Sequence, residues 1–448
     1  MKYFADRHTR KENLRPPDLY EYFVDNFWFK TIDRENQKIN QPLRGSHKAD
    51  VVIVGGGYTG LSAAYNIKRK FPEKNIILLE GACCGYGASG RNGGFCVADV
   101  LLRTIKPKNK QDEVDVSFHG QQQIKMMIEA HGVDCDFAET GRLEVALDDR
   151  QIEALKAYAD HLGSFGLDTT FIAGQELAAE IKSPLFKAGL IIPDGATLNP
   201  AKLVREMKRV VEELGVEVKE RSVVTRILPG KVHRVDTELG DVQAPTLVIA
   251  TNAYSHKLGF FNDRVFPVIV HQIATAPLSQ AQWDSIGWQN RQGLSDMRSL
   301  YSYAIPTVDG RIVMGGREFM YYDFDGLSSG NDKATTNLLV ENLFAFFPQL
   351  EGLTIDHAWS GTTAYTLSGR VPSVGVMGDD RNIYYGVGFS NGVPSCQTAG
   401  RIIADLMAGE SNKFTNHYIV NRKIPYAGPT LLRGLFGKAY KWKKIKFG

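Results

Sequence analysis

Short apolar runs and amphipathic segments follow one another near the start of the chain. The runs VVIV at residues 51–54 and IILL at residues 76–79 are apolar throughout, as expected of strands that are buried on both faces. Between them, residues 61–70 place apolar side chains at helical spacing, and glycines separate this segment from the first run. The pattern predicts a strand, a glycine turn, a helix and a second strand.

Further elements are expected along the rest of the chain. Asn199 as N-cap and Pro200 in the first turn mark the start of a helix over residues 200–214. Helical periodicity also marks residues 114–130, 149–165, 331–346 and a last helix through Met407, whereas strand patterns mark residues 216–220, 223–228, 246–253, 265–277, 300–316 and the start of 383–392. This mixture predicts an α/β (α+β) fold, in which the chain visits a Rossmann-like nucleotide-binding domain three times and inserts a second domain in pieces.

The composition is that of a globular protein with two hydrophobic cores. A chain of 448 residues, 43% hydrophobic and 23% charged, exceeds the size at which single cores stop growing. No apolar stretch reaches the length of a membrane span, and the first thirty residues lack a secretory signal. The five cysteines have no metal-binding spacing. We therefore expect reduced thiols, no metal and a cytoplasmic protein.

Positive charge is concentrated at the end of the chain. Eight of the 53 Lys and Arg residues lie from Arg422 onward, where no acid occurs, which leaves 45 basic and 50 acidic residues in the body. A mildly acidic body argues against nucleic-acid binding. Between Leu431 and Trp442, apolar residues spaced three to four apart accompany the basic ones, as in interfacial helices. This pattern predicts peripheral contact with the inner face of a membrane, or with a partner protein. The alternative is a tail that is solvated or folded onto the acidic body.

A glycine fingerprint follows the first predicted strand. Gly55, Gly57 and Gly60 have the spacing G-x-G-x-x-G, which allows a tight turn, close approach to a pyrophosphate, and close packing of helix on strand. The helix N-terminus then offers free N–H groups to the phosphates. Glu80 ends the second strand twenty residues after Gly60, where a carboxylate can bind both ribose hydroxyls. The segment predicts a dinucleotide site.

Several motifs resemble those of a known enzyme family. The stretch ADVVIVGGGYTGLSAAYNI, then Glu80, then GYGASGRNGGF at residues 85–95 resemble the glycine oxidase/D-amino-acid oxidase (DAO) superfamily of FAD enzymes. The similarity is greatest to the branch that contains gamma-glutamylputrescine oxidase. Residues 195–207, the strands of 223–225 and 247–255, and residues 386–393 resemble further family segments in the same order.

The resemblance implies FAD, bound non-covalently, and the positions that contact it. Residues 87–94 would lie along the flavin and its ribityl-phosphate arm, and residues 386–393 would bring a helix N-terminus to the pyrimidine edge of the ring. Relatives carry Gly-His-Gly where this chain has Asn391-Gly392. The residues expected to bind the cofactor are Gly55, Gly57, Tyr58, Thr59, Gly60, Glu80, Gly87, Ala88, Ser89, Arg91, Asn92, Gly93, Gly94, Val224, Thr251, Gly388, Phe389, Ser390, Asn391, Gly392 and Val393.

The resemblance also implies a division into domains. We expect an N-terminal arm at residues 1–47, an FAD-binding domain made of residues 48–134, 196–262 and 353–421, a substrate domain made of residues 135–195 and 263–352, and a basic tail at residues 422–448. The mixed sheet of the substrate domain would form a roof over the flavin.

Aromatic residues are the main candidates for substrate contact. They can cage an ammonium group or hold a substrate against the flavin, and ordinary core packing is the alternative. The candidates are His271, Tyr301, Tyr303, Trp359 and Tyr365. Many α-amino-acid oxidases of the family clamp the substrate carboxylate with an Arg directly after a Pro, where this chain has Thr307. That difference favours a larger or differently charged amine, and the segment 296–298 resembles the amine-oxidising branch.

The resemblance implies oxidation of a C–N bond in an amine or amino-acid derivative. Hydride would pass from the carbon to flavin N5, the imine would hydrolyse, and oxygen would take the electrons. One alternative is a dehydrogenase that passes electrons to a quinone or carrier. Others are a flavoprotein partner in RNA modification, which the acidic body disfavours, and a flavin-bound protein without turnover.

Overall fold

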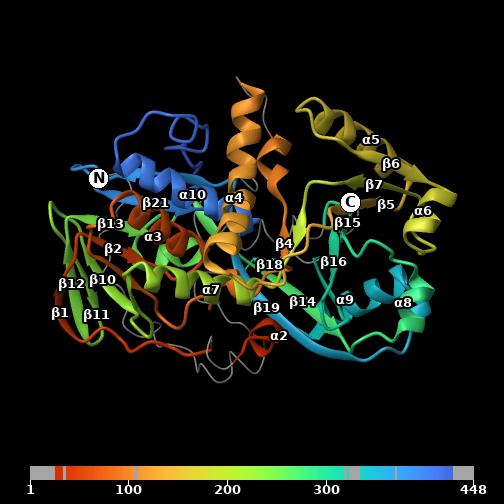
Figure 1. Cartoon of the computed structure of the whole chain (residues 1–448), viewed down its shortest axis with the longest axis horizontal. Helices are drawn as coiled ribbons and strands as arrows, with labels where there is room; N and C mark the ends of the chain where they lie inside the picture. Colours follow the sequence, from red (N-terminus) through yellow and green to blue (C-terminus); the bar gives the residue numbers. More distant parts are fainter. Residues whose placement is uncertain are drawn as a thin grey trace.

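Two large sheets organise the computed structural model, which describes residues 26–33, 37–104, 109–316, 320–321, 333–368 and 371–426. A six-stranded sheet and its helices occupy the left of Figure 1, and a nine-stranded sheet occupies the right. The α/β class predicted from the sequence is confirmed. The domain boundaries expected above stay a prediction.

The six-stranded sheet is mostly parallel. Its strand order is β20 (Ser373–Met377), β21 (Ile383–Val387), β13 (Thr246–Ile249), β2 (Val51–Val54), β3 (Ile76–Leu79) and β9 (Glu217–Lys219). Only the pairing of β20 with β21 is antiparallel. Four helices lie on or beside one face: α3 (Tyr58–Lys70), α4 (Lys110–His131), α7 (Pro200–Glu213) and α10 (Gly392–Met407).

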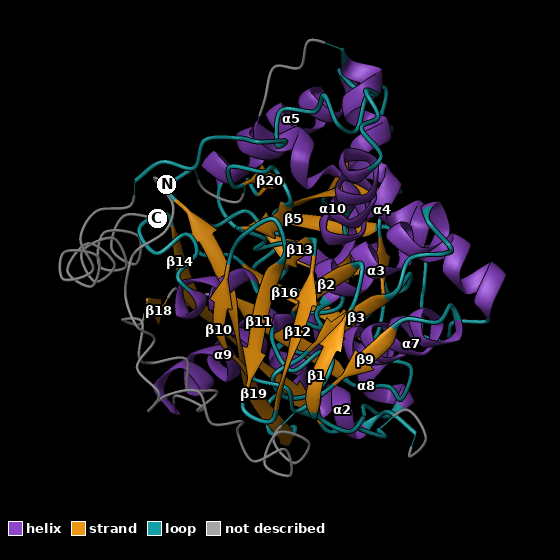
Figure 2. Cartoon of the chain, turned by 90° about the vertical axis from the view of Figure 1, so that its left-hand side faces the viewer, coloured by secondary structure: helices purple, strands orange, loops and turns teal. Residues whose placement is uncertain are grey.

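A second, smaller sheet covers the opposite face. It contains β1 (Gly45–Lys48), β12 (Gly240–Ala244), β11 (His233–Thr237) and β10 (Val224–Leu228), and Figure 2 looks onto it. Val51 and Ile53 of β2 therefore pack under the helices, whereas Val52 and Val54 pack under the small sheet. Burial on both faces explains why this strand is apolar at every position.

The nine-stranded sheet mixes parallel and antiparallel pairs. Its order is β18 (Met320–Tyr321), β14 (Val265–Thr275), β17 (Ile312–Gly316), β16 (Ser302–Pro306), β15 (Gly293–Asp296), β5 (Arg142–Ala146), β7 (Ala188–Ile192) and β6 (Thr170–Ala173), with the long strand β19 (Ile355–Thr366) paired to β14. Helices α8 (Gln280–Ile286) and α9 (Lys333–Phe346) contribute to the core on one face, and α5 (Asp149–Gly163) and α6 (Gln175–Glu180) lie near β6 and β7. The other face is the roof of the site described below.

Short elements complete the fold. They are α2 (Phe27–Lys30), β4 (Phe95–Cys96), β8 (Ala196–Thr197), and the 3-10 helices η2 (Ala88–Gly90), η3 (Ala98–Thr104), η4 (Asn252–Leu258) and η5 (Pro348–Leu350). The aromatic side chains of α2 are buried, and the Trp28 indole donates to the carbonyl of Asn92 at 2.9 Å. The predicted arm is therefore anchored against the segment expected to bind flavin.

The segment 300–316 forms two antiparallel strands, β16 and β17, because the turn at Thr307–Gly310 reverses the chain.

The predicted interfacial helix of the tail lies outside the described residues. Within the part of the chain that is described, no helix combines the length and apolar character needed to cross a bilayer.

A buried carboxylate ties three chain segments together. Glu220, at the end of β9, accepts hydrogen bonds from Arg205 at 2.6 Å and Lys208 at 2.7 Å on α7. It also accepts the backbone N–H groups of Cys84 at 2.6 Å and Asn40 at 2.7 Å. Burial alone raises the pKa of Glu220, but the two cations outweigh it and hold the pKa below its ordinary value.

We expect Glu220→Gln to destabilise the protein strongly, because it leaves two buried cations without their anion. Breaking a buried ion pair costs about 3–5 kcal/mol. Urea unfolding of the FAD-loaded protein measures the change. The control is Glu213→Gln, which removes an exposed ion pair between Glu213 and Arg209 on α7. It should change the free energy of unfolding by less than about 1 kcal/mol. Equal effects of the two substitutions would contradict the assignment.

Candidate functional site

The turn between β2 and α3 is very tight. Gly55 has φ +111°, a conformation that L side chains rarely adopt. A Cβ on Gly60 would lie 1.9 Å from the Gly55 carbonyl oxygen, so any side chain there would force the helix away from the strand. This close packing of helix on strand is the one that the fingerprint predicts for Gly60.

Two helix N-termini open at this side of the molecule without a side-chain cap. Gly57 is the N-cap of α3, and Asn391, the N-cap of α10, makes no capping hydrogen bond. The first-turn N–H groups of a helix need acceptors, and its dipole favours an anion there. The Ser89 hydroxyl accepts the N–H of Tyr58 at 3.0 Å, which joins the 85–95 segment to the start of α3.

Glu80 lies at the end of β3 beside this turn. Its carboxylate accepts the N–H of Gly56 at 2.7 Å and that of Ala82 at 2.9 Å. Burial raises the pKa of Glu80 to about 7, although these backbone donors act against the rise. The carboxylate is therefore held at the carboxyl end of the strand in a state that a small change of environment can ionise.

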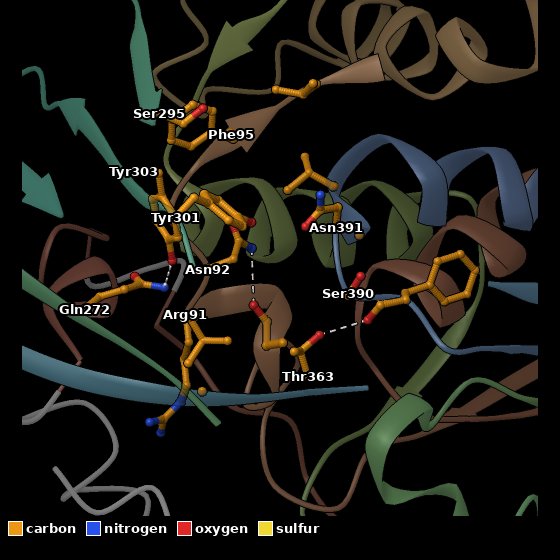
Figure 3. A pocket seen from close by; sticks show the side chains of 18 of the residues that line it. Arg91, Asn92, Phe95, Gln272, Ser295, Tyr301, Tyr303, Thr363, Ser390 and Asn391 are labelled. Atoms are coloured by element: carbon orange, nitrogen blue, oxygen red, sulfur yellow. Dashed lines mark hydrogen bonds between the residues drawn. The ribbon is translucent and has the colours of Figure 1, made fainter. Parts of the chain in front are cut away.

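A cavity of about 370 Å³ is lined by strands of the nine-stranded sheet and by helices and loops of the part of the chain that contains the six-stranded sheet. Figure 3 shows Asn92, Tyr301 and Tyr303 near its centre, with Gln272 on one side and Asn391 on the other. Of the residues predicted to bind the cofactor, those lining it are Tyr58, Ala88, Ser89, Arg91, Asn92, Gly93, Phe389, Ser390, Asn391, Gly392 and Val393. Segments that are some 300 residues apart in the sequence thus meet in one site.

The other predicted cofactor residues lie outside the cavity lining. They are Gly55, Gly57, Thr59, Gly60, Glu80, Gly87, Gly94, Val224, Thr251 and Gly388. The first five belong to the β2–α3 turn and the adjoining end of β3. Their contact with a cofactor stays a prediction.

The predicted catalytic residues fall into two groups. Tyr301, Tyr303 and Tyr365 line the cavity. His271 is buried and does not line the cavity. Its neighbours on β14, Val270 and Gln272, do line it, because successive side chains of a strand point to opposite faces.

Trp359 is also buried outside the lining. It packs against Phe27 and Trp28 of α2 and donates to the carbonyl of Arg91 at 3.0 Å. Its position supports the segment expected to bind flavin from behind.

Strand register aligns one row of residues across the roof. Glu144 on β5 pairs with Ser295 on β15, Ser295 with Tyr303 on β16, Tyr303 with Gly315 on β17, and Gly315 with Gln272 on β14. The row therefore crosses five strands, and all its side-chain-bearing members line the cavity.

Tyr303 occupies the centre of this row. Its ring fills the space beside Gly93, where a Cβ would lie 2.2 Å from the ring, and Gln272 donates to its hydroxyl at 3.2 Å. The sequence interpretation placed residue 93 along the flavin. In the structure Tyr303 itself requires a glycine there.

Thr307 does not line the cavity. It lies in the turn after β16, where its hydroxyl donates to Asp309 and accepts the N–H of Arg311 at 2.9 Å. The absence of an Arg at this position therefore says nothing about how a carboxylate would be recognised. The arginines among the described lining residues are Arg91, Arg142 and Arg298.

Several lining residues escaped the sequence interpretation. Asn252 accepts the N–H groups of Gly388 at 3.0 Å and Phe389 at 3.1 Å and so shapes the loop before α10. It lies within the quoted segment 247–255, which was a usable signal. Glu144 and Gln272 had none, because only strand register places them in the site.

The chain matches the family described as FAD dependent oxidoreductase (DAO) over residues 50–406. Gamma-glutamylputrescine oxidoreductase of Escherichia coli is 31% identical over 425 residues, which cover 91% of this chain and 95% of that protein. Glycine oxidase of Bacillus subtilis is 24% identical over 380 residues, covering 80% and 92%. The alignments thus extend over most of each protein.

Solved structures share the fold. Glycine oxidase from Geobacillus kaustophilus has a TM-score of 0.73 at 19% identity and covers 85% of this chain and 100% of its own. L-proline dehydrogenase from P. horikoshii has a TM-score of 0.69 at 19% identity, covering 84% and 97%.

The residues present fit FAD. The uncapped starts of α3 and α10 suit a pyrophosphate and an electron-rich ring edge. Glu80 suits ribose hydroxyls. The Ser390 hydroxyl, which lines the cavity, is buried without a hydrogen-bond partner among the described residues, and such a group is costly unless a ligand satisfies it.

We expect Gly57→Trp to abolish flavin binding. A Cβ on Gly57 would lie 2.9 Å from the Ser89 hydroxyl oxygen, so an indole there would displace Ser89 and fill the space in front of the helix. The protein should purify colourless, whereas wild type should be yellow with one FAD. The matched control is Gly163→Trp, at a position where nothing lies within 4 Å of the added Cβ. Retention of FAD by the Gly57 variant would refute the role of this turn.

FAD affinity should rise with pH up to about 7. The pKa of Glu80 is raised to about 7, so the carboxyl is protonated below that pH and must lose its proton to accept two ribose hydroxyls. One proton released lowers the Kd by at most about tenfold per pH unit below pH 7 and leaves it constant above. Fluorescence titration of apoprotein with FAD measures this, and Glu80→Gln should remove the pH dependence. An unchanged slope in that variant would exclude Glu80 as its source.

Proposed function

The chain belongs to the DAO family of FAD-dependent oxidoreductases, and from this premise we propose that it oxidises the C–N bond of an amine or amino-acid derivative. The family resemblance read from the sequence is thereby confirmed. The observation that carries the proposal is the cavity, which has predicted flavin-binding segments on one wall and an aromatic, polar roof on the other. The similarity to gamma-glutamylputrescine oxidoreductase supports an amine as the substrate.

Bound FAD would supply the acceptor for the hydride that leaves the carbon next to the amine nitrogen. The chain contributes binding and orientation. Asn252 and Thr363 hold the loop before α10 through the backbone of Phe389, and Asn92 braces the 88–94 turn through the carbonyls of Ala88 and Ser89. A rigid wall of this kind positions the reacting atoms and excludes water.

Tyr303 supports the site as a neutral residue. Burial raises the pKa of its hydroxyl well above the usual range, so it does not serve as a base at neutral pH. Its ring and that of Tyr301, whose centroids are 5.9 Å apart, provide apolar surface for the substrate.

After the hydride and one proton have left, the C=N bond of the product adds water and releases a carbonyl compound and the amine.

The arginines that line the cavity favour an amine over a simple α-amino acid. Arg91 donates to two backbone carbonyls, at 3.1 and 2.9 Å. Arg142 binds Asp99 at 2.7 Å, and Arg298 binds Asp296 through two hydrogen bonds at 2.9 and 2.6 Å. Each fork is thus engaged with the protein, and a substrate carboxylate would have to displace one of these partners.

The cysteine of the cavity supports non-covalent FAD. Cys396 lines the cavity, and burial raises the pKa of its thiol to about 12. Because the thiolate is the nucleophile, this thiol is unreactive at neutral pH. Oxygen, or a quinone or protein carrier, would then take the electrons.

Primary or secondary amines should reduce the flavin at least about tenfold faster than glycine or D-alanine, because a buried carboxylate without a partner costs several kcal/mol. Anaerobic bleaching of the flavin band in a stopped-flow instrument measures both rates. Fast bleaching by the amino acids, with amines inert, would overturn the proposal.

Thr307→Arg provides the matched control. Since Thr307 lies outside the cavity lining, an Arg there should leave the preference for amines unchanged. A gain of activity with glycine would mean that this turn reaches the substrate.

A further inference from the structure

A buried amide on the roof leaves its acceptor unused. The Gln272 side chain, on β14, is 2% exposed and lines the cavity. Its amide nitrogen donates to the Tyr303 hydroxyl at 3.2 Å (Figure 3), whereas its amide oxygen has no hydrogen-bond partner among the described residues. A buried acceptor without a donor costs free energy. The oxygen therefore calls for a donor that a bound molecule supplies.

Close packing fixes how this amide is turned. The Tyr303 ring lies against Gly93 and meets the Phe95 ring edge-on, with centroids 5.6 Å apart. Gly315 lies between Tyr303 and Gln272 in the sheet and pairs with both. A Cβ on Gly315 would lie 2.5 Å from the Tyr303 hydroxyl oxygen and 2.8 Å from Cγ of Gln272. The glycine thus lets the two side chains meet over β17, and their hydrogen bond directs the amide nitrogen to Tyr303 and leaves the oxygen to a ligand.

The roof around Gln272 touches the segment expected to bind flavin. Two residues before Gln272, β14 pairs with Gly361 of β19, and a Cβ on Gly361 would lie 3.0 Å from Cβ of Arg91. On the other side of Gln272, Tyr303 contacts Gly93 of the same segment. The unused acceptor therefore lies at the end of the cavity where the reaction is expected.

A carbonyl oxygen at this place suits the N–H of an amine. When the carbon next to the nitrogen gives its hydride to FAD, the nitrogen lone pair becomes the second bond of C=N, and the N–H stays on the nitrogen. An N–H directed at the amide oxygen keeps that lone pair free. As the hydride leaves, the nitrogen gains positive charge and its N–H becomes a stronger donor. The hydrogen bond is therefore stronger in the transition state than in the bound amine.

We propose that the amide oxygen of Gln272 accepts the N–H of the reacting amine, and that the site is therefore selective for primary and secondary amines over tertiary ones. The inference rests on the proposed function and narrows its substrate class. A neutral primary or secondary amine has an N–H for the oxygen. A neutral tertiary amine has none and leaves the buried acceptor unsatisfied.

Flavin bleaching by two amines that differ in one N–H tests the selectivity. Without oxygen and at saturating amine, N-methylbutylamine should bleach the FAD-loaded wild type at least about tenfold faster than N,N-dimethylbutylamine. Gln272→Met keeps the length of the side chain and removes the amide oxygen. It should slow the secondary amine and leave the tertiary amine within about twofold, so that the ratio of the two rates falls at least about fivefold. An unchanged ratio would overturn the inference.

Binding of an amine that cannot be oxidised measures the hydrogen bond separately. tert-Butylamine has N–H groups but no hydrogen on the carbon next to its nitrogen. Calorimetry with the FAD-loaded protein should give an affinity about 3- to 10-fold lower in Gln272→Met than in wild type, the effect of losing one hydrogen bond. The matched control is Gln280→Met, which removes an exposed amide of α8 and should change neither the affinity nor the bleaching ratio. Equal affinities of wild type and Gln272→Met would count against the contact.

Two further variants separate the acceptor from its surroundings. Gln272→Glu keeps an acceptor oxygen, so it should retain the preference for the secondary amine. Loss of that preference would mean that the amide nitrogen faces the substrate, which overturns the inference. Gly315→Ala should push the Tyr303 hydroxyl away from Gln272 and lower the bleaching ratio by a smaller factor. If the Gln272 variants fail to fold, an unchanged ratio in Gly315→Ala decides against the inference.

The two measurements distinguish this inference from the proposed function. Weaker binding of tert-butylamine by Gln272→Met, without bleaching by any amine, would refute the oxidation and leave the amine contact standing. Bleaching by both amines at the same rates in wild type and in Gln272→Met would refute the contact and leave the oxidation standing.

Discussion

The close packing of α3 against β2 is the constraint on which the site depends. The Gly55 carbonyl occupies the space that a side chain of Gly60 would need, so the helix can start only directly above the strand. Its uncapped N-terminus then opens at the carboxyl edge of the parallel sheet, the edge where open α/β sheets bind ligands. Glu80 and the loop before α10 reach that edge because β3 and β21 run parallel to β2 and β13. The β2–α3 turn, Glu80 and the loop before α10, all expected to contact the cofactor, therefore meet at this shared edge.

Local features of this arrangement could be predicted from the sequence. The apolar run at residues 51–54, the glycine spacing and the acid at position 80 each depend on neighbours within about thirty residues. The helix at residues 200–214 was predicted almost to its ends, because Asn199 accepts the N–H groups that its N-cap position requires. Family motifs extended the prediction to segments far apart in the sequence, since FAD must contact all of them at once.

The roof could not be predicted in the same way. Successive side chains of β14 point to opposite faces of the sheet, so only every second one can reach the cavity. A register shift of one residue would exchange His271 and Gln272 between the two faces. Likewise, Glu144 joins the site only because β5 pairs in parallel with β15, a contact between residues about 150 positions apart. Gly93 was predicted to lie along the flavin, but the requirement for a glycine there comes from the ring of Tyr303 on a distant strand. Pairing of distant strands leaves no signature in a single sequence.

The buried charge cluster around Glu220 has a structural role. Around Glu220 the chain supplies both cations, Arg205 and Lys208. That cluster fixes the position of α7 and β9, which must not depend on a ligand.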